Sequence, residues 1–359
     1  MWQISSNSHA AINNLLIKAH TTCQRQALGE RVVKCSSSKT EEPLQERGIP
    51  LVPPAGISAE MAVVGGTAWM FCREELADQF DLLVVDEAGQ MSLANLLVMA
   101  RCARTILLVG DQQQLAQPSQ ADHPGESGLS CLEYLMQGAH VVPGDRGVFL
   151  ATSWRMEPSL TAMVSELFYD GQLKANPANV VNAIRWCQPF TSASGQPMPR
   201  QGLVFEPVEH NGCSVVCEAE IDRIEQIVDA LLNGSYCHAE AGGEKHGVLG
   251  PEQILVTAPY NVQVNRLQQR LGQRARVGTV DRFQGQEAPV AIHSLTASDG
   301  DAAPRGLGFL LGPNRLNVAI SRAQCLSIVV GSPGLTTGLA NTVEEAEQIN
   351  RLCRITQQP

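Results

Sequence analysis

Residues 80–90 read Phe-Asp-Leu-Leu-Val-Val-Asp-Glu-Ala-Gly-Gln, an apolar run that ends in two adjacent carboxylates. The run predicts a buried strand, with Asp86 and Glu87 directly at its end. A carboxylate in that position can hold Mg²⁺, and its neighbour can polarise a water molecule for in-line attack on a phosphate. An acidic pair can also simply begin a loop, so its meaning depends on what the rest of the chain places beside it.

A second strand supplies such a context. The apolar residues 105–109 run into Gly-Asp-Gln-Gln-Gln-Leu at 110–115. The carboxyl ends of parallel strands meet at one edge of a sheet, where ligands bind. We therefore expect Gln114 to lie near the two carboxylates and to sense a γ-phosphate. The alternative is a plain polar loop over 112–114.

Short apolar strands alternate with helical patterns along the chain, which predicts an α/β fold with parallel sheets. A second cycle starts with a predicted strand at 148–150. We expect a first domain at 1–145, a second at 146–335 and a polar C-terminal tail at 336–359. Two domains suit a chain of 359 residues, since single cores stop growing near ~250–300 residues. Three stretches have no predicted role, namely 21–56, 175–200 and 297–313.

The composition is that of a globular protein, with 44% hydrophobic and 17% charged residues. No apolar run is long enough to span a bilayer and no secretory signal is visible, so we expect a cytoplasmic protein. The net charge is −10, so a nucleic acid would have to bind in a local groove rather than on a basic surface. The eleven cysteines include no Cys-x-x-Cys pair, and no second pair accompanies Cys213 and Cys217. We therefore favour buried, reduced thiols over a metal site.

An arginine near the start of the second domain is in a setting suited to phosphate. Residues 153–158 read Ser-Trp-Arg-Met-Glu-Pro, which puts Arg155 between a large aromatic residue and a proline-stopped turn. This placement fits a cation that reaches a transferring phosphate. Trp154 either stacks on a base or belongs to a core.

Two later segments add to this pattern. Polar residues are densely packed over 277–287, at the end of a predicted strand. On the predicted helix over 314–323, Arg315 and Arg322 are seven positions apart and share a face. Two such arginines are usually solvated charges. Because they follow four other phosphate-suited segments, Arg322 is a candidate arginine finger.

In order and residues, these motifs resemble those of the superfamily 1 helicases. The likeness is to the subgroup that includes the nonsense-mediated-decay RNA helicase and the Dna-two-like nuclease-helicase of Okazaki-fragment processing. Within it, the chain most resembles bacterial proteins that join a RecB-like nuclease to such a helicase. The likeness covers most of residues 1–335, and the segments that carry it are 80–90, 110–115, 123–130, 153–158, 277–287 and 314–324. It implies two RecA-like domains with ATP and Mg²⁺ between them.

The resemblance implies a role for each matching residue. Asp86 corresponds to the Mg²⁺-linked aspartate, Glu87 to the residue that activates water, and Gln114 to the glutamine that couples the γ-phosphate to the domain interface. Arg155 and Arg322 correspond to the two second-domain arginines that reach the γ-phosphate. The other matches are Trp154, Gly285 and Glu287 on the ATP side, and Ser8, Thr67, Pro259, Tyr260 and Thr279 on the nucleic-acid side.

The chain departs from the family pattern in two places. His9 stands where the family often has Asn. The sequence also contains no Gly-x-x-x-x-Gly-Lys-[Ser/Thr] loop, and the resemblance begins one strand late. We therefore expect the first domain to be incomplete, without the phosphate-binding loop and its strand, and the chain alone to hydrolyse ATP negligibly.

These observations predict the C-terminal part of an ATP-dependent helicase or translocase. The resemblance implies 5′-to-3′ movement on a single strand, with DNA favoured over RNA, and it allows an upstream nuclease domain. The alternative is a non-catalytic nucleic-acid-binding or regulatory module. A nuclease in its own right is disfavoured, because the sequence shows no carboxylate–lysine cluster of the RecB type.

Overall fold

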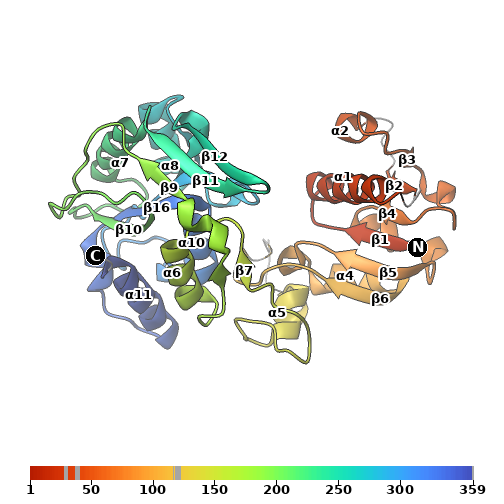
Figure 1. Cartoon of the computed structure of the whole chain (residues 1–359). Helices are drawn as coiled ribbons and strands as arrows, with labels where there is room; N and C mark the ends of the chain where they lie inside the picture. Colours follow the sequence, from red (N-terminus) through yellow and green to blue (C-terminus); the bar gives the residue numbers. More distant parts are fainter. Residues whose placement is uncertain (28–30, 37–40, 116, 118–122, 358–359) are drawn as a thin grey trace. The chain divides into compact units, whose positions relative to one another are not determined.

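The computed structural model describes residues 1–27, 31–36, 41–115, 117 and 123–357. The chain divides into two compact units, Met1–Ala139 and His140–Pro359 (Figure 1). The division therefore falls a few residues before position 145, where the sequence placed the domain boundary.

The first unit is built on a six-stranded parallel sheet in the order β3-β2-β4-β1-β5-β6. Its strands are β1 (Trp2–Ser5), β2 (Val32–Cys35), β3 (Leu51–Val52), β4 (Val63–Gly65), β5 (Phe80–Val85) and β6 (Ala103–Leu108). Its α-helices are α1 (His9–Arg25), α2 (Glu42–Gln45), α3 (Ala68–Phe71), α4 (Leu93–Ala100) and α5 (Cys131–Met136). Apolar side chains of α1 and α2 pack on one face, and those of α3, α4 and α5 pack on the other.

Helix α1 illustrates why these elements form. The Ser8 hydroxyl caps the helix by accepting from the Ala11 N–H at 3.1 Å. Ile12 and Leu16, four positions apart, then face the sheet and are fully buried. The helix lies close to β4 because Gly65 has no side chain; a Cβ there would be 2.5 Å from Leu16 Cδ1.

Strand β6 lies at one edge of this sheet. It corresponds to the strand predicted at 105–109, but it is poorly covered. Ile106 and Leu107 are exposed, Leu107 by 49% of its surface, and Val109 just after the strand is exposed as well. The edge therefore presents both open backbone groups and apolar side chains to solvent.

The second unit has a five-stranded parallel sheet in the order β10-β16-β15-β13-β14. These strands are β10 (Gly202–Pro207), β13 (Ile254–Thr257), β14 (Arg276–Gly278), β15 (Ala288–Ser294) and β16 (Ala323–Gly331). Smaller sheets are formed by β7 (Thr152–Ser153) with β8 (Lys174–Ala175), and by β9 (Ala183–Arg185), β11 (Ser235–Glu240) and β12 (Gly243–Val248). Its α-helices are α6 (Pro158–Phe168), α7 (Glu218–Leu231), α8 (Asn261–Leu271), α9 (Leu307–Leu310), α10 (Pro313–Ile320) and α11 (Val343–Thr356).

Helices cover both faces of this sheet (Figure 1). Val290 and Ile292 of β15 face a core shared with α7 and α8, whereas Ala291 between them faces α6, α9, α10 and α11. Burial on both faces explains why the strands read as continuous apolar runs. The predicted α/β class with two parallel-sheet units is confirmed.

Two predicted elements of this unit are wrong. No strand forms at 148–150, where Val148 and Leu150 are exposed; the short strand begins at Thr152, which pairs with Lys174. The stretch 336–359 is not a polar tail alone, because α11 within it packs Leu352 and Ile355 into the core. Its apolar residues recur at helical spacing among many charges, which the average polarity of the stretch conceals.

Candidate functional site

The two carboxylates lie at the carboxyl edge of the first sheet. Strand β5 pairs with β1 and with β6, and the Asp86 N–H donates to the carbonyl of Ser5 at 2.9 Å. Glu87 follows with φ 54° and ψ 41°, a left-handed conformation that is uncommon for a residue with a side chain. The backbone thus turns sharply after the strand and leaves both carboxylates at its end.

The turns after β5 and β6 touch through their backbones. The Ala88 N–H donates to the Val109 carbonyl at 2.9 Å. A Cβ at Gly89 would be 2.8 Å from the Asp111 carbonyl oxygen, and a Cβ at Gly110 would be 2.7 Å from the Ala88 nitrogen. Only glycine permits this approach, so the two strand ends that carry the acidic pair and the glutamine segment are brought together.

Gln114 is held in this second turn by its neighbour. Its side-chain Nε2 donates to Asp111 Oδ2 at 3.0 Å, and Asp111 Oδ1 accepts from the Gln113 N–H at 2.9 Å. Asp111 therefore fixes the turn that presents Gln114. Its role follows from the Asx-turn geometry and was not assigned from the sequence.

The environment of Asp86 suits a cation. Burial raises the pKa of its carboxyl above the ordinary value, while the Glu87 backbone and Lys18 oppose this shift in part. At the end of β1, the buried Ser5 and Ser6 hydroxyls have no hydrogen-bond partner in the part of the chain that the structure describes. A desolvated carboxylate and unsatisfied hydroxyl oxygens at the ends of two neighbouring strands are donors of the kind that Mg²⁺, which prefers oxygen ligands, can use. Asp86 would hold the ion, and Glu87 would face its water.

In the second unit, hydrogen bonds bring three of the predicted residues, Arg155, Glu287 and Arg322, to adjoining turns. Arg155, just after β7, contacts Glu287 through Nε and Oε2 at 2.6 Å, and its Nη1 donates to the Ser321 carbonyl at 3.0 Å. Arg322 donates from Nη1 to the Gln286 carbonyl at 3.2 Å. The polar segment before β15 and the turn after α10 therefore meet at Arg155. Trp154 and Gly285 are the chain neighbours of this group.

The side chains at this site differ in how far they are exposed to solvent. Arg322 is 3% exposed, whereas Glu287 and Trp154 are exposed, Trp154 by 75%. The reading of Trp154 as a core residue is therefore wrong. Gly285 has φ +73°, a conformation that favours glycine, and this turn directs Glu287 toward Arg155. Gln324 Nε2 also donates to Glu287 Oε1 at 3.0 Å.

One geometric prediction about the arginines fails. Helix α10 ends at Ile320, so Arg322 lies in the following turn and does not share a helix face with Arg315. Arg315 instead contacts Asp281, with Nη1 and Oδ2 3.3 Å apart. The seven-residue spacing has no meaning once the helix has ended.

The residues predicted to contact nucleic acid fall at adjacent strand ends within each unit. Ser8 follows β1 and Thr67 follows β4, its parallel neighbour. Pro259 and Tyr260 follow β13, and Thr279 follows β14, its neighbour. Two details modify the expectation. The Ser8 hydroxyl already caps α1, and His9 Nδ1 accepts from the buried Lys34 Nζ at 3.0 Å.

A cluster of aromatic and cationic groups beside Tyr260 was not predicted. The ring of Phe309 lies between two guanidinium groups, with Arg305 Cζ at 3.7 Å and Arg315 Cζ at 4.3 Å from its centroid. The Tyr260 and Phe309 rings are 5.5 Å apart. Tyr260 is 8% exposed and burial raises the pKa of its phenol, which the Arg305 charge opposes. The cluster joins the end of β13 to α10 and to the 297–313 segment, whose role the sequence left open.

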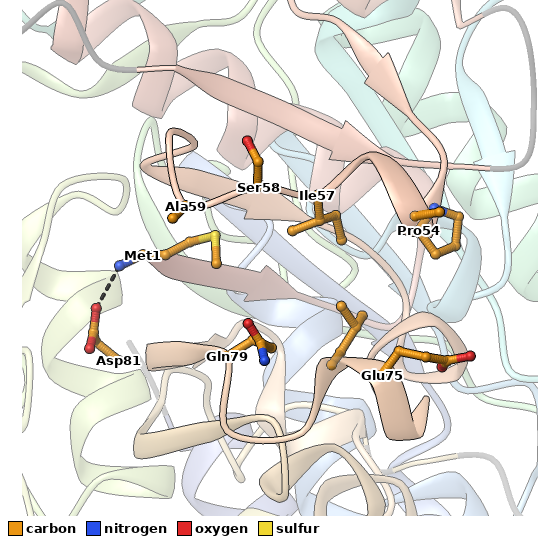
Figure 2. A pocket seen from close by; sticks show the side chains of 10 residues that line it. Met1, Pro54, Ile57, Ser58, Ala59, Glu75, Gln79 and Asp81 are labelled. Atoms are coloured by element: carbon orange, nitrogen blue, oxygen red, sulfur yellow. Dashed lines mark hydrogen bonds and ion pairs between the residues drawn. The ribbon is translucent and has the colours of Figure 1, made fainter.

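A hollow of about 460 Å³ in the first unit is lined by neither Asp86 nor Glu87 (Figure 2). It is lined by Pro54, Ile57, Glu75 and their neighbours, and it includes the Met1 ammonium, which is 2.6 Å from Asp81 Oδ2. Asp81 lies at the start of β5 and Asp86 just beyond its end, so the hollow is at the opposite edge of the sheet.

Among the described residues, no helix combines the length and apolarity needed to cross a membrane.

Comparison with known proteins gives consistent matches. A family model described as an AAA domain matches residues 128–334, and a second model with the same description matches residues 30–117. The chain is 29% identical over 272 residues to a regulator of nonsense transcripts 1 homolog of Drosophila melanogaster, which covers 71% of this chain and 21% of that protein. It is 29% identical over 281 residues to the ATP-dependent helicase NAM7 of Saccharomyces cerevisiae, covering 72% of this chain and 26% of that protein.

A third relative matches over nearly the whole chain. The probable helicase MAGATAMA 3 of Arabidopsis thaliana is 27% identical over 365 residues, which is 94% of this chain and 42% of that protein. The chain thus spans less than half the length of each of these three relatives.

Proposed function

The chain belongs to the AAA-domain family and is similar to ATP-dependent helicases, and from this premise we propose that it is part of a superfamily 1 helicase that moves along a nucleic acid by hydrolysing ATP. Its two parallel-sheet units have the RecA-like fold of that class. In the proposed reaction, each unit contributes its own group of side chains. Each ATP cycle advances the protein along a single strand, in the 5′-to-3′ direction and on DNA rather than RNA.

The observation that carries the proposal is the pair of half-sites. The first unit places Asp86, Glu87 and Gln114 on two touching turns. The second unit places Arg155 and Arg322 on two turns that meet. Carboxylates for Mg²⁺ and water on one side, and arginines for the transferring phosphate on the other, are the two halves that phosphoryl transfer requires. Bound Mg²⁺ supplies a charge that neutralises the phosphates.

The contacts in the second unit suggest how ATP is sensed. Arg155 is held by Glu287, a half-exposed ion pair whose strength in water is small, about 0–1 kcal/mol. A γ-phosphate carries more charge than one carboxylate and would compete for this arginine. We propose that Arg155 moves from Glu287 to the phosphate when ATP binds, while Arg322 stays anchored to the Gln286 carbonyl.

The nucleic-acid track is proposed to run along the strand ends that carry Ser8 and Thr67 in one unit, and Pro259, Tyr260 and Thr279 in the other. Arg305 and Arg315 beside Tyr260 supply the local positive charge that a chain of net charge −10 needs there. Exposed Trp154, near the arginines, is proposed to stack on the adenine.

A non-catalytic nucleic-acid-binding module is the second candidate, because the printed sequence lacks a Gly-x-x-x-x-Gly-Lys-[Ser/Thr] loop. Without that lysine, a β/γ-phosphate cation is missing, so we propose that the 359-residue chain alone hydrolyses ATP negligibly. We also propose a cytoplasmic location. The chain's resemblance further suggests a nuclease domain elsewhere in the gene product.

The test compares Mg²⁺-dependent ATP hydrolysis by the 359-residue chain and by the full-length gene product, each with and without single-stranded DNA. We expect negligible turnover by the former and DNA-stimulated turnover by the latter. In the full-length protein, Glu87→Gln should abolish hydrolysis but keep fluorescent-ATP binding, whereas the exposed Glu74→Gln should change neither. Robust turnover by the short chain contradicts the argument from the missing loop. Full activity of Glu87→Gln removes that residue from its role.

A further inference from the structure

The loop between β10 and α7 holds a histidine and two cysteines that converge. His210, Cys213 and Cys217 each offer one ligand atom, and these three atoms all lie within 4.8 Å of one another. The group is secluded: Cys217 is 1% exposed and the His210 side chain 5%. The sequence favoured buried, reduced thiols here, because no second cysteine pair accompanies Cys213 and Cys217; it did not identify His210.

The surroundings of His210 are those of an oriented ligand. One imidazole nitrogen, Nε2, is 3.0 Å from Glu220 Oε1, and the other, Nδ1, is 2.8 Å from Ser298 Oγ. A histidine that ligates a metal through one nitrogen usually has its other nitrogen hydrogen-bonded to a carboxylate or another acceptor. Either nitrogen can therefore turn to an ion while the other keeps the ring in place.

Releasing one of these bonds leaves no buried group unsatisfied. Glu220 is fully buried and also accepts from Ser294 Oγ at 2.5 Å and from the Thr296 N–H at 2.9 and 3.0 Å. Ser298 Oγ still accepts from the Cys213 N–H at 2.9 Å. The polar shell is thus complete with or without the His210 bond, which is what a site that gains and loses an ion requires.

We propose that His210, Cys213 and Cys217 bind a Zn²⁺ ion. Two thiolates and an imidazole are the ligands that Zn²⁺ prefers, whereas Mg²⁺ prefers oxygen. As the two Zn–S bonds form, each cysteine loses its thiol proton to solvent, and the sulfur electron pairs go to the metal. Burial, together with the nearby Glu220 carboxylate, holds the pKa of the Cys217 thiol at about 12 in the metal-free protein, so the ion itself must displace this proton.

The ion would be held within one loop. Cys217 is at the N-cap position of α7, and His210 and Cys213 lie in the loop before it. Through Ser298, the same group reaches the segment that leads to Arg305 and Phe309. Bound zinc would therefore fix the β10–α7 loop at the carboxyl edge of the sheet, next to the end of β15.

A second, exposed group provides a matched control. Cys237, Glu244 and His246 on the β11–β12 hairpin also place their ligand atoms within 4.8 Å of one another. Glu244 and His246 are open to solvent, and among the described residues no buried shell orients them. Removing the ligands of this group tests whether any metal uptake comes from the proposed site.

The experiment measures metal binding by the reduced, purified chain. Metal is removed with a chelator, Co²⁺ is added in steps, and thiolate-to-cobalt absorption bands are recorded; Zn²⁺ is then added to displace the cobalt. We expect one equivalent bound, with bands that the Cys213→Ser/Cys217→Ser variant lacks and the Cys237→Ser/His246→Ala variant keeps. His210→Gln should retain the fold and weaken Co²⁺ binding by at least about tenfold.

Three results would overturn the proposal. The wild-type chain could show no thiolate bands, the Cys213→Ser/Cys217→Ser variant could keep them, or the control variant could lose them. A Cys213–Cys217 disulfide in place of metal, seen as a mass loss of two hydrogens under the same reducing conditions, would do so too. If the double-serine variant does not fold, melting of the Cys237→Ser/His246→Ala variant decides. Zn²⁺ must raise its melting temperature by more than an equal concentration of Mg²⁺ does, and a chelator must reverse the rise.

Discussion

Replacing Gly110 by alanine should destabilise the first unit, because the two turns after β5 and β6 touch there. A Cβ at this position would lie 2.7 Å from the Ala88 nitrogen and 3.1 Å from the Gly89 nitrogen. Both neighbours are backbone atoms, so they cannot rotate away as a flexible side chain can. Forcing an extra methyl group into such a contact costs about 1–3 kcal/mol.

Part of this cost is offset in the unfolded chain. Alanine restricts the unfolded backbone more than glycine, which stabilises the folded state by about 0.4–1 kcal/mol where the conformation permits it. Taking the midpoints of the two ranges, the net loss for Gly110→Ala is then about 1.3 kcal/mol. Gly144→Ala is the matched control, since a Cβ there meets no atom within 4 Å and its φ is not left-handed. It should be neutral or stabilising by about 0.4–1 kcal/mol.

Urea unfolding, followed by hydrogen–deuterium exchange in peptides from each unit, measures both variants. Gly89→Ala perturbs the same contact from its other side, with a Cβ 2.8 Å from the Asp111 carbonyl oxygen. The double variant should therefore lose less free energy of unfolding than the sum of the single losses. Wild-type stability of Gly110→Ala, or an equal loss in Gly144→Ala, would refute the close approach of the two turns.

Three further predictions concern the charged residues. Because burial raises the pKa of Asp86, its ionised form opposes folding at neutral pH. Asp86→Asn should therefore raise the free energy of unfolding at neutral pH, and this gain should shrink as the pH falls from the raised pKa to the ordinary carboxyl value. Urea unfolding at several pH values measures both effects. In the full-length protein, Arg322→Ala should lower ATP turnover about 10³–10⁵-fold, and a loss below tenfold in a variant that melts normally would remove Arg322 from its catalytic role. The double variant Arg305→Gln/Arg315→Gln should weaken single-stranded DNA binding and make it less sensitive to salt, by about one released ion for each arginine that no longer touches a phosphate. Replacing the exposed Arg185 by glutamine should change neither property. Fluorescence anisotropy at several salt concentrations measures both variants.

The sequence predicted those features that depend on local pattern and on parallel topology. Apolar runs identified β5 and β6, and the rule that parallel strands end at one edge placed Asp86 near Gln114. The fold class followed from the same alternation of strands and helices. These inferences need only neighbours along the chain and one general property of sheets.

Features that depend on where a helix stops, or on contacts between distant segments, escaped this reasoning. The pairing of Arg315 with Arg322 failed because α10 ends at Ile320. The packing of helix α11 into the core was missed because its buried Leu352 and Ile355 are outnumbered by charged residues. The stack of Phe309 between two arginines has no local sequence signal, since one partner comes from a loop and the other from a helix.

The exposed edge at β6 has a practical consequence for anyone who handles this protein. In the part of the chain that the structure describes, β6 pairs with β5 alone, so its other side, beside Ile106 and Leu107, offers a template for strand addition. Two copies that meet at this rim can extend each other's sheets without unfolding. Storage at high concentration should therefore favour slow growth of light-scattering aggregates, and a lysine in place of Leu107 should suppress it.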